Sequence, residues 1–163
     1  MKYNKVAVGG TFDHFHKGHK ALLNRAFESG YKVIVGLTSD SYSVNKSQEY
    51  NIRKSSLEKY LKGKNYEIFK LEDPYGPAIS DKEIDAIVVS SETKEKALEI
   101  NFYRQNHGLD SLEIIVVPLV KADNGKRISS TGIRNGKITK EVKYYNLYVF
   151  VCSIYNRFFL VKE

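Results

Sequence analysis

Short aliphatic runs alternate along this chain with longer stretches in which apolar residues recur at helical spacing. The runs predict five buried strands, at residues 5–8, 32–37, 66–71, 86–89 and 112–117. The stretches between them predict helices, marked by Leu22, Leu23, Ala26 and Phe27, then by Ile52, Leu57, Tyr60 and Leu61, and then by Ala97, Leu98 and Asn101. The chain therefore repeats the order strand, helix, strand.

Residues with special backbone preferences predict where these elements end. Gly30 is placed to end the first helix, Gly63 the second and Gly108 the third. Asn51 is a candidate N-cap for the second helix. Residues 73–77 combine two prolines with a glycine and predict a loop.

Near-continuous Val and Ile runs separated by helices are typical of a parallel sheet that is covered on both faces. We therefore expect an α/β fold, a Rossmann-like, doubly wound sheet of five parallel strands, in a single domain. Such sheets bind ligands beyond the carboxyl ends of their strands. Thr11, Thr38, Ser90 and Ser129 follow the first, second, fourth and fifth strands, so polar groups are expected to meet there.

Composition narrows the choice of ligand. The chain of 163 residues is 42% hydrophobic and 28% charged, with a net charge of +7. A basic protein attracts polyanions, but one cysteine allows no zinc-finger spacing, and no stripe of interleaved basic and aromatic residues accompanies the charge. A cleft for small polyphosphates explains the sign of the charge equally well, so the charge alone does not choose between the two. Because neither sequence pattern is present, we expect no nucleic-acid partner.

The single cysteine and the first apolar run bear on the cellular compartment. Cys152, the single cysteine, has no internal disulfide partner, which favours a reducing cytoplasm. The apolar run at residues 6–8 is too short for a signal peptide and fits a strand. No membrane span is expected.

Residues 9–19 are the stretch around which the rest is organised. Gly9 and Gly10 follow the first predicted strand, and a helix begins shortly after. Exposed backbone N–H groups and the positive end of the helix dipole point at such a junction, so it can hold a phosphate. His16 and His19 are three residues apart and share one face of the helix start, where imidazoles can stabilise transition-state charge.

Three interpretations of this cluster remain open from the residues alone. His14, His16 and His19 are surface residues of a capped helix in the first. In the second they bind a metal together with Asp13, because imidazole and carboxylate suit zinc. In the third they form part of a nucleotide site.

Resemblance to a known family favours the third interpretation, the nucleotide site. Residues 16–19 resemble the HxGH signature of the nucleotidylyltransferase superfamily, and residues 10–13 resemble the GTFD that precedes it. Residues 128–134 resemble the superfamily's second signature, ISSTxIR. Residues 90–93 are similar to the VVSxET stretch of archaeal and eukaryotic phosphopantetheine adenylyltransferases. Cytidylyltransferase relatives share HxGH but often carry an RTExxSTT-type second motif.

The resemblance implies a reaction in which an adenylyl group passes from ATP to 4′-phosphopantetheine, giving dephospho-coenzyme A and pyrophosphate. It implies catalytic roles for His19 and for a phosphate-binding lysine, for which Lys46 is the candidate. It implies ATP contacts for Gly10, Phe12, His16, Gly18, Ser129, Ser130, Thr131 and Arg134. It implies acceptor contacts for Thr11, Asp13, Ser90, Glu92 and Thr93. Mg²⁺ would arrive with ATP, without a metal cage built by the protein.

Purely structural interpretations of some of these residues remain open as well. Residues 38–40 also read as a polar helix start with Lys46 solvated, Ser90 to Thr93 as a helix cap, and Arg53 as surface charge. Asn101 and Arg104 also resemble residues of this family, but the resemblance implies no clear role for them. The functional alternatives are a cytidylyltransferase with another phosphate acceptor and a non-enzymatic nucleotide-binding module.

The end of the chain departs from the family pattern. We expect residues 1–143 to form the nucleotidylyltransferase domain and residues 144–163 to be an apolar extension that packs on the domain or on a second subunit. Asn156 and Arg157 interrupt its apolar run, which is shorter than the ~20 residues that a membrane span needs.

Overall fold

A computed structural model describes residues 1–43, 46–121 and 128–136, so the expected extension at 144–163 lies outside the described residues. Its strands are β1 (Tyr3–Gly10), β2 (Gly30–Thr38), β3 (Tyr66–Leu71), β4 (Ala86–Ser90) and β5 (Glu113–Val117). Its helices are α1 (Lys17–Ser29), α2 (Tyr50–Leu61), the 3₁₀ turn η1 (Gly76–Ile79), α3 (Lys94–Asn106) and the short α4 (Ser130–Arg134). Within these ranges no helix has the length and apolarity needed to cross a bilayer.

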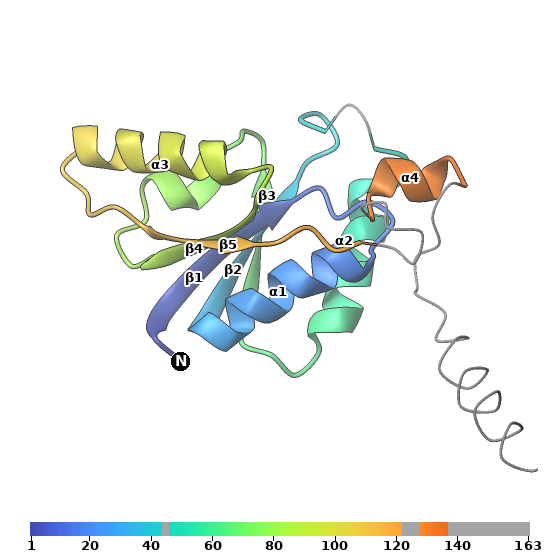
Figure 1. Ribbon diagram of the computed structural model, residues 1–163, viewed down its shortest axis with the longest axis horizontal. Coiled ribbons are helices and arrows are strands. Elements are labelled where there is room, and N and C mark those ends of the chain that lie inside the picture. Colours follow the sequence, from blue (N-terminus) through green and yellow to red (C-terminus); the bar gives the residue numbers. More distant parts are fainter. Residues whose placement is uncertain (44–45, 122–127, 137–163) are drawn as a thin grey trace, which may run out of the picture.

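The five strands form one parallel sheet in the order β3-β2-β1-β4-β5, which confirms the predicted fold class (Figure 1). The chain winds outward from β1 in one direction through β2 and β3, then returns to the other side of β1 with β4 and β5. The order reverses between β1 and β4, and α/β sheets bind their ligands at such a switch point. All five carboxyl ends lie along the same edge of the sheet.

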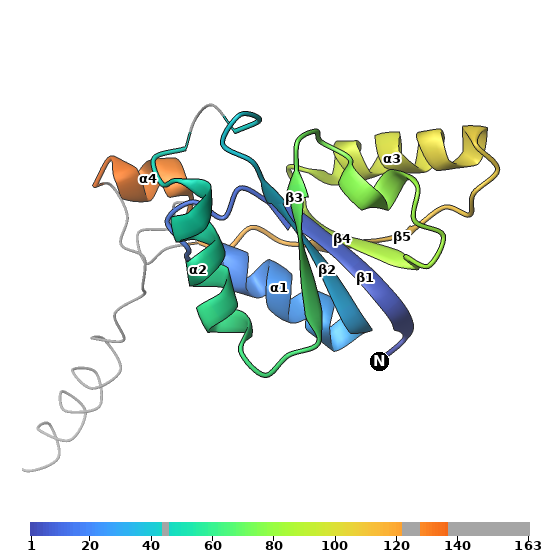
Figure 2. The same ribbon diagram turned by 180° about the vertical axis from the view of Figure 1, so that it is seen from behind.

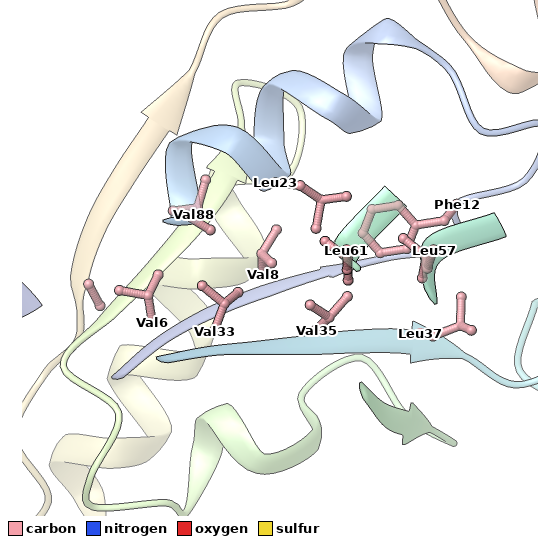
Figure 3. Close-up of a cluster of buried hydrophobic side chains, with 12 residues drawn as sticks. Val6, Val8, Phe12, Leu23, Val33, Val35, Leu37, Leu57, Leu61 and Val88 are labelled. Atoms are coloured by element: carbon pink, nitrogen blue, oxygen red, sulfur yellow. The ribbon is translucent and has the colours of Figure 1, made fainter. Parts of the chain in front are cut away.

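Helices cover both faces of the sheet. Helices α1 and α2 lie on one face, and α3 with η1 lies on the other (Figures 1 and 2). Successive residues of a strand point to opposite faces, so Val6 and Val8 enter the core beneath α1 while Ala7 enters the core beneath α3. Leu23 of α1 and Leu57 of α2 fill the first core, as Figure 3 shows.

The predicted helix ends are mostly correct. Gly30 is the C-cap residue of α1, while Gly63 and Gly108 follow α2 and α3 with φ of +80° and +70°, backbone angles that glycine adopts at little cost. The predicted cap at Asn51 is wrong, because α2 begins at Tyr50 and its N-cap residue is Glu49, two residues before Asn51, without a side-chain cap bond.

Candidate functional site

The loop between β1 and α1 has a strained backbone. Phe12 and His14 both have positive φ, of 50° and 46°, which is rare for residues with a Cβ. The ring of Phe12 is 1% exposed and belongs to the core beneath α1 and α2, so burial of this large side chain fixes the loop. Strain of this kind persists only where the surroundings impose it, and it gathers at functional sites.

The two histidines of the motif begin α1 and hold each other in place. His16 is the N-cap residue, and its Nδ1 accepts a hydrogen bond from the Gly18 N–H at 3.1 Å. The His16 N–H in turn donates to Nδ1 of His19 at 3.4 Å, which completes a capping box. The rings stack with their centroids 3.7 Å apart. Because each Nδ1 accepts, each neutral ring carries its proton on Nε2 and can donate from there.

The glycine between the histidines leaves room for this arrangement. A Cβ on Gly18 would lie 3.0 Å from Cε1 of the His16 ring, closer than carbon atoms normally approach. The ring could not then turn back onto the Gly18 N–H. The HxGH spacing therefore has a steric reason in this structure.

Burial keeps both imidazoles neutral at physiological pH. Burial, with a smaller contribution from His14, lowers the pKa of His16 to about 4. Burial, with a smaller contribution from His16, lowers the pKa of His19 to about 3. Phe12 lies edge-on to His19 at 5.2 Å between ring centroids, and Phe15 stacks on it at 5.8 Å. These apolar rings provide the dry surroundings that disfavour the charged form.

The alternatives to a nucleotide site are not supported by this geometry. His16 is 5% exposed, so it is not a surface residue. In the described ranges no three His, Cys, Asp or Glu side chains are grouped to hold a metal ion. Asp13 and His14 are instead joined to the chain segment before α2, through Ser47 and Gln48.

The loop between β2 and α2 is fastened to the β1–α1 loop. The Asp13 carboxylate, 2% exposed, accepts the N–H groups of Ser47 at 3.2 Å and Gln48 at 3.1 Å. The Gln48 side chain accepts the His14 N–H at 2.8 Å. Thr11 Oγ1 lies 3.3 Å from Ser43 Oγ. These bonds bring Lys46 to the same edge of the sheet as the histidines.

A fully buried arginine of α2 joins the ends of the first two strands. Nη1 of Arg53, which is 0% exposed, donates to the backbone oxygens of Thr11 at 2.8 Å and Thr38 at 2.9 Å. Its Nε donates to the Gln48 oxygen at 3.0 Å, and its Nη2 to Asp40 Oδ1 at 2.8 Å. The interpretation of Arg53 as surface charge is therefore wrong.

The second motif closes over the first. Ser129 caps α4 by accepting the Gly132 N–H at 3.1 Å. Ser130 Oγ donates to the backbone oxygen of Asp13 at 2.6 Å, across 117 residues of sequence. The two motifs therefore meet in space and form one structure.

A cavity of about 200 Å³ lies between the two motifs. His16, Gly18 and His19 line one side, and Ser129 and Ser130 line another. Its wall is completed by Ser90, by Glu92, by Val117 at the end of β5, and by the following residues Pro118, Leu119 and Val120. The cavity combines Nε2–H donors and helix N-termini with an apolar strip, which suits a nucleotide.

A second cavity, of about 390 Å³, lies on the α3 side of the same edge. Gly10, Leu71, Pro74, Ile87 and Val89 contribute to its mainly apolar lining. Thr93 and Lys96 lie at its α3 side, and Glu92 lines both cavities. Two ligands can therefore meet across Glu92.

Comparison with known proteins identifies the family. The model of the family described as cytidylyltransferase-like matches residues 7–136. Over 142 residues, 48% are identical to the phosphopantetheine adenylyltransferase of Methanothermobacter thermautotrophicus, a match that covers 84% of this chain and 87% of that protein. The phosphopantetheine adenylyltransferase of Pyrococcus abyssi is 45% identical over 146 residues, covering 85% of this chain and 93% of its own. The chain belongs to the phosphopantetheine adenylyltransferases of the cytidylyltransferase-like family.

A solved structure agrees with the fold. The crystal structure of a protein with unknown function from Archaeoglobus fulgidus superposes with a TM-score of 0.65 and 36% sequence identity. The match covers 69% of this chain and 88% of the other. The Rossmann-like sheet described above is therefore the architecture of a related protein as well.

Most of the family-based site residues gather at the two cavities. His16, Gly18, Ser129 and Ser130, expected to contact ATP, line the first cavity together with His19. Ser90 and Glu92, expected to contact the acceptor, line the first cavity, and Glu92 and Thr93 line the second. Thr93 occupies the N-cap position of α3 but turns its hydroxyl back to the Ser90 N–H, so the expected cap bond is absent.

Several of the expected site residues are buried, line the other cavity, line neither cavity, or are paired within the protein. The ring of Phe12 and the carboxylate of Asp13 are buried and engaged inside the protein, where they support the loop. Gly10, assigned to ATP, lines the second cavity. Thr131 and Arg134 of α4 do not line either cavity, and Lys46 is paired with Asp40 at 3.2 Å.

Sequence reasoning missed the apolar parts of both cavities and the buried arginines. Arg104, 1% exposed, donates to the backbone oxygens of Ala78, Asp81 and Asp110, and Asn101 bonds both the N–H and the oxygen of Leu112. The family resemblance of these two residues therefore reflects support of the α3 layer. The periodicity of α3 offered a signal, because Ala97, Ile100 and Arg104 lie on one helical face.

Proposed function

We propose that this protein transfers the adenylyl group of ATP to 4′-phosphopantetheine, forming dephospho-coenzyme A and releasing pyrophosphate. The observation that carries the proposal is the pair of cavities that share Glu92 at the switch point of the sheet. ATP occupies the cavity between the two motifs. The pantetheine arm, a long chain with few charges, occupies the more apolar cavity beside α3.

The reaction is a single displacement at phosphorus. An oxygen of the acceptor phosphate attacks the α-phosphorus of ATP, and a new P–O bond forms. The bond between the α-phosphorus and the bridging oxygen to the β-phosphate breaks, and the electron pair leaves with pyrophosphate. The attacking phosphate is already anionic, so no side chain has to act as a base. Catalysis then consists of positioning and of charge stabilisation.

The neutral histidines are suited to this task. His19 Nε2–H donates to an oxygen on the α-phosphorus, where negative charge accumulates in the transition state. His16 Nε2–H and the first N–H groups of α1 and α4 hold the remaining phosphate oxygens. Thr11, whose backbone oxygen is fixed by Arg53, orients the acceptor phosphate from the end of β1.

Lys46 contributes a positive charge on the acceptor side of the reacting phosphates. Mg²⁺ bound to ATP would neutralise part of the polyphosphate charge. The described residues provide no group of three ligands for a resident metal, so the ion's ligands would come mainly from the nucleotide and water. The cytoplasmic location expected from the single cysteine stays a prediction.

A substrate panel tests the proposal. The full-length protein is incubated with ATP, Mg²⁺ and 4′-phosphopantetheine, and pyrophosphate release and dephospho-coenzyme A are measured. We expect both products in equal amounts, and none when either substrate is omitted. CTP in place of ATP should support much slower turnover.

The panel also distinguishes the alternatives. Turnover only with CTP and a different phosphate acceptor would assign the protein to cytidylyl transfer. Binding of ATP without turnover of any nucleotide and acceptor pair would reject an enzyme in favour of a nucleotide-binding module.

A further inference from the structure

Asp40, two residues beyond the end of β2, joins two cations that serve the site. Its Oδ1 accepts from Arg53 Nη2 at 2.8 Å and lies 3.2 Å from Lys46 Nζ. Its Oδ2 accepts the Tyr50 N–H at 3.0 Å. Both carboxylate oxygens are therefore held, one by the start of α2 and the other by a buried guanidinium.

The rigidity of Asp40 comes from its neighbours. Arg53 is 0% exposed and is fixed by three backbone oxygens, so it cannot move without breaking the join between β1 and β2. Lys46 differs, because its side chain is 18% exposed and its recorded ion pair is the one with Asp40. The Asp40 carboxylate is thus held by Arg53 and the Tyr50 N–H, and the longer, more adaptable Lys46 side chain is paired with it.

The charges at this point are not balanced. Two cations, Arg53 and Lys46, share the Asp40 carboxylate, so these three side chains together carry about one positive charge near the Thr11 end of β1, where the buried Asp13 carboxylate also lies. The Tyr50 N–H, followed by Arg53 and Lys46, lowers the pKa of Asp40 to about 2, so the carboxylate stays ionised throughout the physiological range. An arriving phosphate can compensate the excess charge while Arg53 continues to neutralise Asp40.

We propose that Asp40 is a positioning residue for adenylyl transfer, which holds the Lys46 ammonium where it meets the phosphates. The inference rests on the proposed function and extends it, because no motif resemblance assigns a role to Asp40. Its contribution acts through Lys46 and involves no contact of Asp40 with substrate.

Asp40→Asn is the central variant. The amide keeps an oxygen for Arg53 but loses the charge that attracts Lys46, and its NH2 group replaces the oxygen that accepts the Tyr50 N–H. We expect kcat to fall roughly tenfold, since a misplaced charge next to the reacting atoms costs transition-state stabilisation, with a smaller change in KM for ATP. Asp40→Glu restores the charge on a longer arm and should recover part of the lost kcat.

A double variant separates positioning from general damage. In a Lys46→Ala background, Asp40→Asn should change kcat by less than about twofold, because the residue through which Asp40 acts is gone. Glu72→Gln is the matched control. It removes another exposed carboxylate near this loop, paired with Lys70 at 2.8 Å and Ser41 at 2.9 Å, and should leave kcat unchanged.

Chemical labelling tests the pair without depending on turnover. Full-length variants are treated briefly with an acetylating reagent, and modification of Lys46 is quantified by peptide mass spectrometry against Lys54. Asp40→Asn should raise the labelling rate of Lys46 by roughly two- to fivefold, the change expected when an exposed ion pair is lost. Asp40→Glu and Glu72→Gln should not.

Each outcome decides one question. Unchanged Lys46 labelling in Asp40→Asn would overturn the inference even if the enzyme is active. The inference would also be overturned if Asp40→Asn raised Lys46 labelling but kept the wild-type kcat. It would be overturned as well if Asp40→Asn lowered kcat equally in the wild-type and Lys46→Ala backgrounds. Wild-type protein that is inactive in the substrate panel would reject the proposed function and with it any catalytic role of the pair, while the labelling would still report whether Asp40 holds Lys46.

Discussion

His19 is the residue on which the proposed chemistry depends most. Its Nδ1 is occupied by the His16 N–H, and its ring is surrounded by Phe12, Phe15 and His16. We expect His19→Ala to lower kcat by roughly 10²–10³-fold, the loss typical of one oxyanion donor, with a much smaller change in ATP affinity. Steady-state kinetics and calorimetric ATP titration measure the two quantities separately.

A matched control is available on α3. His107 is exposed and its Nδ1 bonds the Tyr103 oxygen, far from both cavities, so His107→Ala should keep wild-type turnover. Turnover of His19→Ala within a few-fold of wild type would remove His19 from the chemical step.

At this scale the sequence was informative about residue types and less about their surroundings. The pair His16 and His19 was predictable because three-residue spacing puts both on one face of a helix start. The burial of Asp13 was not, because its partners Ser47 and Gln48 follow 34 and 35 residues later. A sequence motif identifies a side chain, but it does not predict whether that side chain contacts a ligand or is buried within the protein.

Among the elements, α2 carries the most specific structural prediction. Arg53→Ala would remove the arginine donor from the backbone oxygens of Thr11, Thr38 and Gln48, and from Asp40 Oδ1, which keeps Lys46 as a partner. Each buried oxygen left without a donor costs about 1–3 kcal/mol, so losing the arginine should lower the free energy of unfolding by about 3–5 kcal/mol. Urea denaturation measures the loss.

Arg25→Ala provides the comparison. Arg25 lies on α1 in a surface pair with Glu28 at 3.7 Å and is half-exposed, so its removal should change stability by about 0.5 kcal/mol or less. If both arginine variants unfold at the same urea concentration, Arg53 does not join the strand ends in solution.

The strands were the most predictable elements, because β1, β2 and β4 contain near-continuous aliphatic runs that are buried on both faces, while the edge strands β3 and β5 are only partly buried. Helix α2 shows the limit of pattern reasoning. Asn51 was the natural cap by residue type, yet α2 starts at Tyr50, whose N–H is taken by Asp40 ten residues earlier. A tertiary hydrogen bond replaced the local cap, and no local pattern encodes it.

For the whole molecule, the buried histidines make stability depend on pH. An unfolded chain protonates imidazole near its ordinary pKa of 6.5, whereas the folded protein holds His16 and His19 neutral down to about 4 and 3. Between these values the unfolded state binds more protons, so stability is fully present above pH 6.5 and is lost as pH falls. Each pKa unit corresponds to about 1.4 kcal/mol.

Thermal melts at pH 7 and pH 5 test this dependence. This window lies above the ordinary pKa of the Asp and Glu carboxylates, so we expect the imidazoles to dominate the drop in Tm. A His16→Gln, His19→Gln double variant should show a much smaller drop between the two pH values, whatever its stability at pH 7. An equal drop in both proteins would mean that the two rings are not held neutral.

The central claim is that the α-phosphoryl group of ATP moves to the acceptor as part of an adenylyl unit, across the boundary at which the two cavities share Glu92. The most direct measurement follows two isotopic labels. With 4′-phosphopantetheine as acceptor, ATP labelled at the α-phosphate should deliver its label to dephospho-coenzyme A, and ATP labelled at the γ-phosphate should deliver its label to pyrophosphate alone. Appearance of the γ label in the organic product, or retention of both labels in ATP under conditions where both substrates bind, would contradict the account.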